Sequence, residues 1–345
     1  MAALTVPVRS PDEWLQGADA MVVPLLSPAE EAECRLGFSP YLASVEGARL
    51  LPLDWLLLGD HGLLIESLDA QMALRPTKAH HVAAASGGSA TLDLPDREER
   101  IAEPCVLIGS HPAHYHWLTY YLPRLVALER APELAGLPLL VGDNLTAGQA
   151  EALRIAGIDE GRLRRLARGA LYRFDELWVP SLLTWRLRVH PVALRWLRRT
   201  YLGTDAPGAG KRRLFVSRRD ASIRHLLNED EVVALLARYG FETVEAARLG
   251  FGAQARLFGE AEWVVGGTGS GLSNIVFAPP GATVVELHNN DAADFIEALC
   301  PALGQRYVRI MGNIRPELGK LVHDCDFTVP LAPLEALLGD AARPS

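Results

Sequence analysis

The glycine-rich segment 266–274 carries the residue types that point most directly to chemistry. It reads Gly-Gly-Thr-Gly-Ser-Gly-Leu-Ser-Asn and follows an apolar run that ends at Val265. Glycines let a backbone approach a ligand closely, and the first N–H groups of a following helix lack internal partners and attract an anion. A turn that needs glycine only for its geometry is the alternative interpretation. The segment predicts a diphosphate-binding loop made by Gly267, Thr268, Gly269, Ser270, Gly271 and Asn274.

A carboxylate follows at the end of the next apolar run. Glu286 stands near the end of the stretch 283–287, which comes after the turn Pro279-Pro280-Gly281. Because ligands of open α/β sheets lie beyond the carboxyl ends of the strands, we expect Glu286 to accept a hydrogen bond from a ribose hydroxyl. The glycines and this carboxylate also suggest a nicotinamide-dependent oxidoreductase as an alternative. Their spacing is shorter than the ~20 residues of that fingerprint, and no Lys-Ser/Thr follows the glycines as in a Walker A loop.

Three histidines lie close together further upstream, just after the apolar run 105–108: His111, His114 and His116. An imidazole, whose ordinary pKa is about 6.5, can take a proton from a hydroxyl at physiological pH. These histidines are therefore candidate general bases, and Asp143, after the next apolar run, is a reserve candidate. A structural role for the histidines is the alternative. No acidic or cysteine ligand stands near them, so we expect no metal site.

Alternating apolar and helical segments must position these residues. Residues 1–100 indicate short strands, and from 105 onward strands at 105–109, 137–141 and 176–179 alternate with helices at 117–130 and 147–156. The turn-rich stretch 203–210 predicts a linker. After it, strands at 214–217 and 243–244 alternate with helices at 229–239 and 253–260, the first of which starts with the capping-box spacing of Asn228 and Glu231.

This alternation predicts an α/β protein with two domains that each contain a mostly parallel sheet. We expect an N-terminal domain over 1–203, strand-rich over 1–100 and α/β over 104–200. We expect a C-terminal domain over 211–330, followed by a C-terminal helix and tail over 331–345.

Composition excludes several classes of protein. The 345 residues carry a net charge of -8, which argues against nucleic-acid binding as the main activity. Four cysteines without a Cys-x-x-Cys pair predict neither a zinc ribbon nor a disulfide framework. The N-terminus lacks the pattern of a secretory signal, and no run approaches a membrane span. We expect a cytoplasmic protein whose only membrane contact would be peripheral, at the inner face.

Several separated blocks of the chain resemble the family 61 glycosyltransferases. The C-terminal blocks are 214–222 (Leu-Phe-Val-Ser-Arg-Arg-Asp-Ala-Ser), Arg224, Asn228-Glu229, Gly240-Phe241, Gln254, the glycine-rich segment and 279–287, and the upstream block is His114 to Leu118 with Leu122-Pro123-Arg124-Leu125. Together they cover roughly residues 104–290 in the order that this family shows.

The resemblance implies a GT-B architecture, with two Rossmann-like domains that face a cleft. It also implies an inverting, metal-independent transferase that moves a sugar from a UDP-linked donor to a glycan or glycoconjugate acceptor, with no cofactor. In this family pattern His116 ranks first as the base, and Arg218, with Arg224 as a weaker second, binds the diphosphate. An arginine that pairs with Glu229 or Asp230 at the surface is the alternative for Arg218.

One departure from the family pattern concerns the loop itself. Many members have a histidine where this chain has Thr268 and an alanine where it has Ser270. Hydroxyl groups carry no charge, so stabilisation of the leaving group must depend more on arginine. The departure also leaves open a catalytically silent protein that only binds nucleotide sugars.

Overall fold

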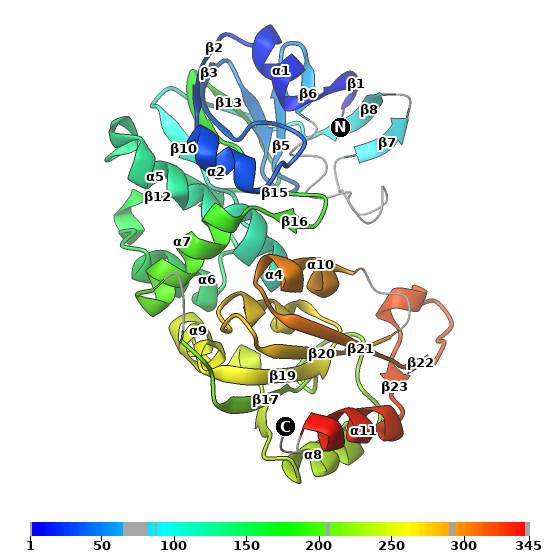
Figure 1. The fold of residues 1–345 in the computed structure, drawn as a ribbon. Coiled ribbons are helices and arrows are strands. Elements are labelled where there is room, and N and C mark those ends of the chain that lie inside the picture. The colour runs from blue at the N-terminus through cyan, green and yellow to red at the C-terminus, as the bar shows by residue number, and fades with distance from the viewer. Residues whose placement is uncertain (1, 65–81, 87, 205–207, 290–293, 342–345) are drawn as a thin grey trace. The chain divides into compact units, whose positions relative to one another are not determined.

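The computed structural model describes residues 2–64, 82–86, 88–204, 208–289 and 294–341. The chain divides into two compact units, Met1–Trp196 (unit 1) and Leu197–Ser345 (unit 2), and Figure 1 shows that each combines strands with helices. The α/β class is therefore confirmed. The division falls inside helix α7 (Pro191–Leu202), ahead of the expected linker at 203–210, of which residues 205–207 lie outside the described parts.

Unit 1 is rich in strands, as the sequence of its first hundred residues predicts. Its strands are β1 (Ala2–Arg9), β2 (Ala20–Pro24), β3 (Tyr41–Glu46), β4 (Arg49–Leu51), β5 (Leu56–Gly59), β6 (Gly62–Leu64), β7 (Val82–Ser86), β8 (Ser89–Leu94), β9 (Glu98–Ile101), β10 (Cys105–Leu107), β11 (Leu139–Gly142), β12 (Leu163–Leu166), β13 (Leu171–Phe174), β14 (Glu176–Pro180), β15 (Thr184–Trp185) and β16 (Arg188–Val189). Its helices are α1 (Pro11–Gly17), α2 (Pro28–Glu33), α4 (His114–His116), η1 (Trp117–Tyr121), η2 (Leu122–Leu125), α5 (Val126–Arg130), η3 (Pro132–Leu134), α6 (Ala147–Ile155), η4 (Glu160–Arg162) and the start of α7.

Two sheets organise unit 1. An eight-stranded sheet has the order β7-β8-β1-β6-β5-β4-β13-β9, and a six-stranded sheet has the order β12-β11-β10-β14-β3-β2. In the second sheet β10 lies between β11 and β14 and runs parallel to both. The loops after β10 and β11 therefore leave the sheet at the same edge, which is where His111 and Asp143 follow in the sequence.

Unit 2 contains one parallel sheet and the helices that cover it. Its strands are β17 (Arg212–Val216), β18 (Glu242–Val244), β19 (Ala261–Gly267), β20 (Thr283–His288), β21 (Arg306–Met311), β22 (Asn313–Ile314) and β23 (Phe327–Thr328). Its helices are α8 (Glu229–Ala237), η5 (Ala246–Arg248), α9 (Phe251–Gly259), η6 (Ser270–Val276), α10 (Phe295–Ala302), η7 (Val322–Asp324) and α11 (Leu331–Ala341).

The five-stranded sheet of unit 2 has the order β18-β17-β19-β20-β21, and all of its pairs are parallel. Numbered along the chain, this is the order 2-1-3-4-5 of a doubly wound sheet. The chain reverses direction across the sheet between β17 and β19, and ligands of such sheets bind beyond the strand ends at this switch point. Both Arg218 and the glycine-rich segment directly follow these two strands.

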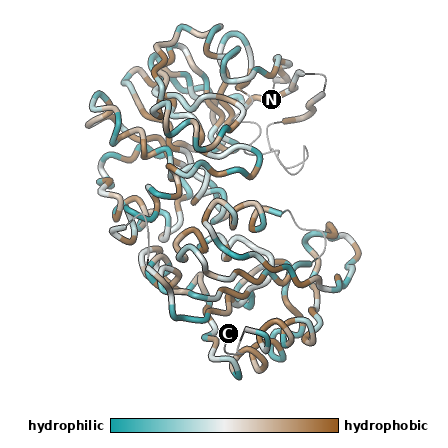
Figure 2. Tube along the Cα trace, viewed as in Figure 1, coloured by the Kyte–Doolittle hydropathy of each residue, from teal (hydrophilic) through white to brown (hydrophobic). Residues whose placement is uncertain are grey.

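Helices cover both faces of this sheet. One face packs against α8 and α11 around a core that includes Phe215, Val265 and Val285, and Figure 1 shows α9 and α10 on the opposite side. In Figure 2 hydrophobic stretches follow the central strands of the unit, whereas polar stretches lie on its outer turns. Burial of this apolar surface is the main force that holds the strand ends in place.

Side chains cap the starts of several helices, but not at the position that the sequence analysis selected. Ser10 and Ser27 form capping boxes with Glu13 and Glu30 at the starts of α1 and α2. The capping box expected at Asn228 is wrong, because that side chain bonds to the backbone of Val329 instead, accepting from its N–H at 3.0 Å and donating to its C=O at 2.9 Å.

No helix among the described residues is both long enough and apolar enough to cross a lipid bilayer.

Candidate functional site

The glycine-rich loop connects β19 to η6 at the switch point of the sheet in unit 2. The expected helix after the loop is present, but it is a short 3-10 helix of about two turns, Ser270–Val276. Gly266 and Gly267 still belong to β19 and pair with Glu286 and Leu287 of β20. The loop is therefore held in place by the strand before it and by the buried helix after it.

The glycines of this loop make room for Arg218. A Cβ atom on Gly269 would lie 1.8 Å from Nη1 of Arg218, and one on Gly267 would lie 2.6 Å from its Cδ. The φ of 167° at Gly269 is extended backbone that any residue can adopt, so the need for glycine here is steric. The loop and the guanidinium group pack tightly against each other. The sequence pattern alone did not reveal this contact.

Arg218 is a buried cation. Its Nε donates to the C=O of Arg224 at 2.8 Å and its Nη2 donates to the C=O of Ile223 at 2.6 Å. In the described parts of the chain Nη1, which lies against Gly269, makes no hydrogen bond. Burial, and the neighbouring charge of Arg224, lower the pKa of Arg218 to about 10, which still leaves it charged at neutral pH.

The alternative of a surface ion pair for Arg218 is wrong. It is Arg219 whose side chain pairs with Asp230 and approaches Glu229, whereas Glu229 contacts Arg218 only through the backbone N–H. Within the described residues no carboxylate is hydrogen-bonded to this guanidinium, although Asp220, Glu229 and Asp326 lie close enough to interact with its charge. A buried guanidinium with an unused N–H donor attracts an anion.

Arg224 adds a second cation close by. Its φ of +58° is unusual for a residue with a side chain, and its N–H donates to the C=O of Asp324 at 3.2 Å. Within the described residues its buried Nε has no hydrogen-bond partner. Burial lowers the pKa of Arg224, while the carboxylates of Asp324 and Glu286 oppose that effect. Arg218 and Arg224 together create positive potential beside the loop.

Other loop residues divide into buried and accessible ones. Thr268 is fully buried, and both its N–H and its hydroxyl donate to the C=O of Leu287, at 3.0 and 3.4 Å. Asn274 donates to Oε1 of Gln254 at 2.8 Å and thus ties η6 to α9. Ser270 and Gly271 are half-buried and form the part of the loop that reaches the surface.

Glu286 lies under the same loop. It is fully buried, and its Oε2 accepts a hydrogen bond of 2.6 Å from the hydroxyl of Tyr307 on β21. In the described parts of the chain Oε1 has no partner that satisfies hydrogen-bond geometry. Burial raises the pKa of Glu286. The hydroxyl groups of Tyr307 and Thr268 partly oppose this rise.

The histidines belong to unit 1, at the edge where β10 ends. A Cβ atom on Gly109, whose φ is +84°, would lie 2.5 Å from the ring of Tyr121, so glycine allows this ring to approach the backbone. The ring of His111 stacks on Tyr121 at 6.3 Å and on His116 at 4.3 Å between centroids. The stack brings together two of the three expected imidazoles, His111 and His116.

Both stacked imidazoles are neutral at physiological pH. Burial lowers the pKa of His116 to about 3, and the neighbouring His111 adds to this effect. Burial lowers the pKa of His111 to about 4, and the N–H of Ala113 donates to its Nδ1 at 3.0 Å, a bond that only an unprotonated nitrogen can accept. Of the two ring nitrogens of His116, Nδ1 is the one that is both buried and without a partner in the described residues.

The other two candidate bases have different surroundings. His114 is the first residue of α4 and is half-buried. Asp143 is exposed at the end of β11, where Arg168 approaches its carboxylate at 3.4 Å. A pKa of about 3 makes the imidazole of His116 a weak proton acceptor in the free protein.

The helical run that begins with the histidines is irregular, although the sequence predicted one helix over 117–130. It consists of α4, the π-helix η1, the 3-10 helix η2 and α5. Pro123 has no N–H to donate to the C=O of Thr119, four residues earlier. The hydroxyl of Thr184 donates to that oxygen instead, at 2.5 Å. This long-range contact explains how the run tolerates its proline.

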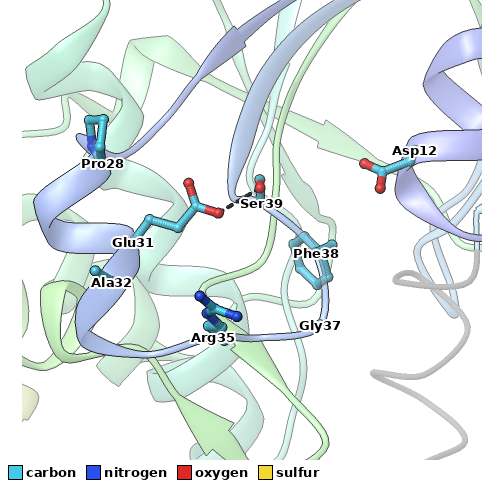
Figure 3. A pocket seen from close by; sticks show the side chains of 8 residues that line it. All are labelled: Asp12, Pro28, Glu31, Ala32, Arg35, Gly37, Phe38 and Ser39. Carbon is cyan, nitrogen blue, oxygen red and sulfur yellow. Dashed lines mark hydrogen bonds between the residues drawn. The ribbon is translucent and has the colours of Figure 1, made fainter.

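A separate pocket of unit 1, of about 430 Å³, lies near α1 and α2. Figure 3 shows its lining, in which Ser39 donates to Glu31 at 2.6 Å. The lining residues are Asp12, Pro28, Glu31, Ala32, Arg35, Gly37, Phe38 and Ser39. None of them is a residue that the sequence analysis selected.

Comparisons with known proteins agree with the resemblance noted in the sequence. The model of the family described as glycosyltransferase 61 matches residues 114–285, about half of the chain. The EGF domain-specific O-linked N-acetylglucosamine transferase of Drosophila melanogaster is 31% identical over 114 residues, which cover 32% of this chain and 22% of that protein. The chain thus matches only about a fifth of the length of this relative. The matched family segment contains His116, Arg218, Arg224 and the glycine-rich loop.

Proposed function

The chain belongs to glycosyltransferase family 61, and from this premise we propose that it moves a sugar from a UDP-linked donor to a hydroxyl group of a glycan or glycoconjugate acceptor. Glycosyl transfer itself rests on the family. The identity of the donor, inversion at the anomeric carbon, independence of a metal ion and the GT-B architecture are parts of the proposal.

The buried guanidinium of Arg218 is the observation that carries the assignment of the donor site. It lies against Gly267 and Gly269 at the switch point of a doubly wound sheet, with Nη1 free of hydrogen bonds within the described residues. A diphosphate would accept from this nitrogen and from N–H groups at the start of η6. Glu286 would accept from a ribose hydroxyl through Oε1.

In the proposed reaction, one group accepts the proton of the acceptor hydroxyl and two others stabilise the leaving phosphate. The oxygen of the acceptor hydroxyl attacks the anomeric carbon, and its proton passes to His116 in unit 1. The bond between the anomeric carbon and the phosphate oxygen breaks, and its electron pair leaves with UDP. The charges of Arg218 and Arg224 stabilise the negative charge that develops on this phosphate, which supports a mechanism without a metal ion.

Nucleotide binding tests the proposal directly. Because charge-assisted hydrogen bonds contribute roughly 1.5–3 kcal/mol, Arg218→Ala should weaken UDP binding by about tenfold or more. Calorimetry on the parent and the variant measures this loss, with Arg256→Ala on the exposed side of α9 as the control. NAD serves as the competing ligand. Binding of NAD in place of UDP, or equal binding of UDP to both proteins, would contradict the assignment.

Turnover separates an enzyme from a silent binding protein. The parent should slowly hydrolyse the UDP-sugar that it binds, and His116→Gln should reduce this rate while leaving UDP affinity unchanged, because the two sites belong to different units. Tight binding without any hydrolysis or transfer would favour the silent alternative.

A further inference from the structure

The turn that holds Arg218 is itself closed by a histidine and an aspartate. His225 and Asp326 are 101 residues apart in the sequence, and Asp326 lies beyond the segment that the family model matches. Neither residue was selected from the sequence. Their contacts determine the shape of the turn 221–225.

Hydrogen bonds fix both the C=O and the N–H of one peptide group at this turn. The C=O of Arg224 accepts from Nε of Arg218 at 2.8 Å, and the N–H of the same peptide, on His225, donates to Oδ1 of Asp326 at 2.8 Å. Any movement of this peptide would therefore move Arg218. The bonds also hold Arg224 at its positive φ, a conformation that costs free energy unless its surroundings fix it.

The imidazole ring of His225 joins the two ends of the turn. Its Nδ1 lies 3.0 Å from Oδ1 of Asp326, and its Nε2 lies 2.8 Å from the C=O of Ala221. Both partners are acceptors, and a neutral imidazole has a proton on only one nitrogen. Only the imidazolium form donates both hydrogen bonds.

We propose that His225 is a positioning residue whose protonated ring, paired with Asp326, closes the turn 221–225 and so holds Arg218 ready for the diphosphate of the donor. The effect on donor affinity rests on the proposed function, whereas the closure of the turn does not. The site would bind its donor best when His225 is charged.

Other charged groups lie around this ring and contribute to its electrostatic environment. Asp326 interacts with both His225 and Lys320. Arg218 interacts with Arg224 and with the carboxylates of Asp220, Glu229 and Asp326. The imidazole side chain is 41% exposed, so it exchanges protons with solvent. Deprotonation would remove one of the two bonds and a positive charge near the donor.

Calorimetric titration with UDP-N-acetylglucosamine from about pH 6 to about pH 8 tests this proposal, because loss of the imidazolium proton would leave one of the two acceptors without a donor. Each phosphate of this probe carries one ionised oxygen throughout this range, and the range stops short of the pH at which uracil ionises, so the charge of the probe stays constant. Parent affinity should fall by about fivefold or more as the pH rises. His225→Gln should bind weakly at every pH with little slope, and Asp326→Asn should behave similarly. His61→Gln, at an exposed histidine of unit 1, is the matched control and should keep the parent slope.

NMR of the histidine side-chain nitrogens measures the protonation state of His225 without any ligand. Protons on both nitrogens of His225 at about pH 6, with loss of that signature in Asp326→Asn, would support the closure. A neutral His225 ring at this pH, or a His225→Gln variant that retains the parent affinity and slope, would overturn it. If the imidazolium signature is present but no nucleotide sugar binds at any pH, the turn stands as described and the proposed function fails.

Discussion

At the scale of single residues, the role of the glycines differs from the one that the sequence suggested. The sequence analysis assigned them to close approach of a ligand. In the structure Gly267 and Gly269 leave the volume that the Arg218 side chain occupies. The loop therefore acts on a donor largely through the arginine that it accommodates.

Gly269→Ala tests this steric role. The added methyl group would overlap Nη1 of Arg218 and displace the guanidinium group, so UDP affinity should fall by roughly tenfold, comparable to loss of a charge-assisted hydrogen bond. Calorimetry with UDP measures the change. Gly339→Ala on α11 is the matched control, because a methyl group there meets no atom within 4 Å. Unchanged affinity in Gly269→Ala would show that Arg218 does not act through this position.

At the scale of elements, long-range contacts decide what local patterns leave open. Pro123 interrupts the helical run that carries His116, and Thr184, on the short strand β15, satisfies the oxygen that the proline leaves without a donor. This hydroxyl therefore stabilises the irregular run.

Thr184→Val therefore should destabilise unit 1 by roughly 1–3 kcal/mol, since it leaves a buried carbonyl without a donor while conserving shape. Chemical denaturation followed by tryptophan fluorescence measures the loss. Thr184→Ser retains the hydroxyl and should lose much less stability than Thr184→Val. Equal losses in the two variants would assign the effect to packing of the methyl group.

The contrast between local patterns and long-range contacts explains how much could be predicted from the sequence. Strands β10, β14, β17, β19 and β20 and helices α6 and α9 lie where the apolar patterns placed them, because each pattern reflects burial of that segment. The glycine-rich loop was selected from its glycines and His116 from the resemblance to family 61, and their roles in the site stay predictions. The capping box at Asn228 was wrong, and His225 and Asp326 were missed. In each case a hydrogen-bond partner lies about a hundred residues away in the sequence.

At the scale of the whole molecule, the two units should respond differently to acid. The pKa values of His111 and His116 are lowered to about 4 and about 3, from an ordinary value of 6.5. A histidine with a lowered pKa favours folding while it is neutral. Its contribution is complete above about pH 6.5 and is lost as the pH falls toward the folded-state pKa.

We expect the stability of unit 1 to fall between about pH 6.5 and about pH 4, by up to about 1.4 kcal/mol per pH unit for each histidine. Urea denaturation at several pH values measures the slope. The variant His111→Phe keeps an aromatic ring in the stack and should show a shallower slope than the parent. A slope that is the same in both proteins would mean that carboxylates, rather than this pair, govern acid sensitivity.

The π-helical turn at Trp117–Tyr121 has a consequence for how this chain can change in length. A π turn contains one residue more than an α turn, and each residue of a helix advances the direction of the side chains by about 100°. Deleting a single residue here would restore a regular helix and rotate everything after it relative to His116. Arg124 would then swing away from the C=O of Ile108, to which it donates at 3.0 Å. Homologues with insertions or deletions should therefore accommodate them outside this turn.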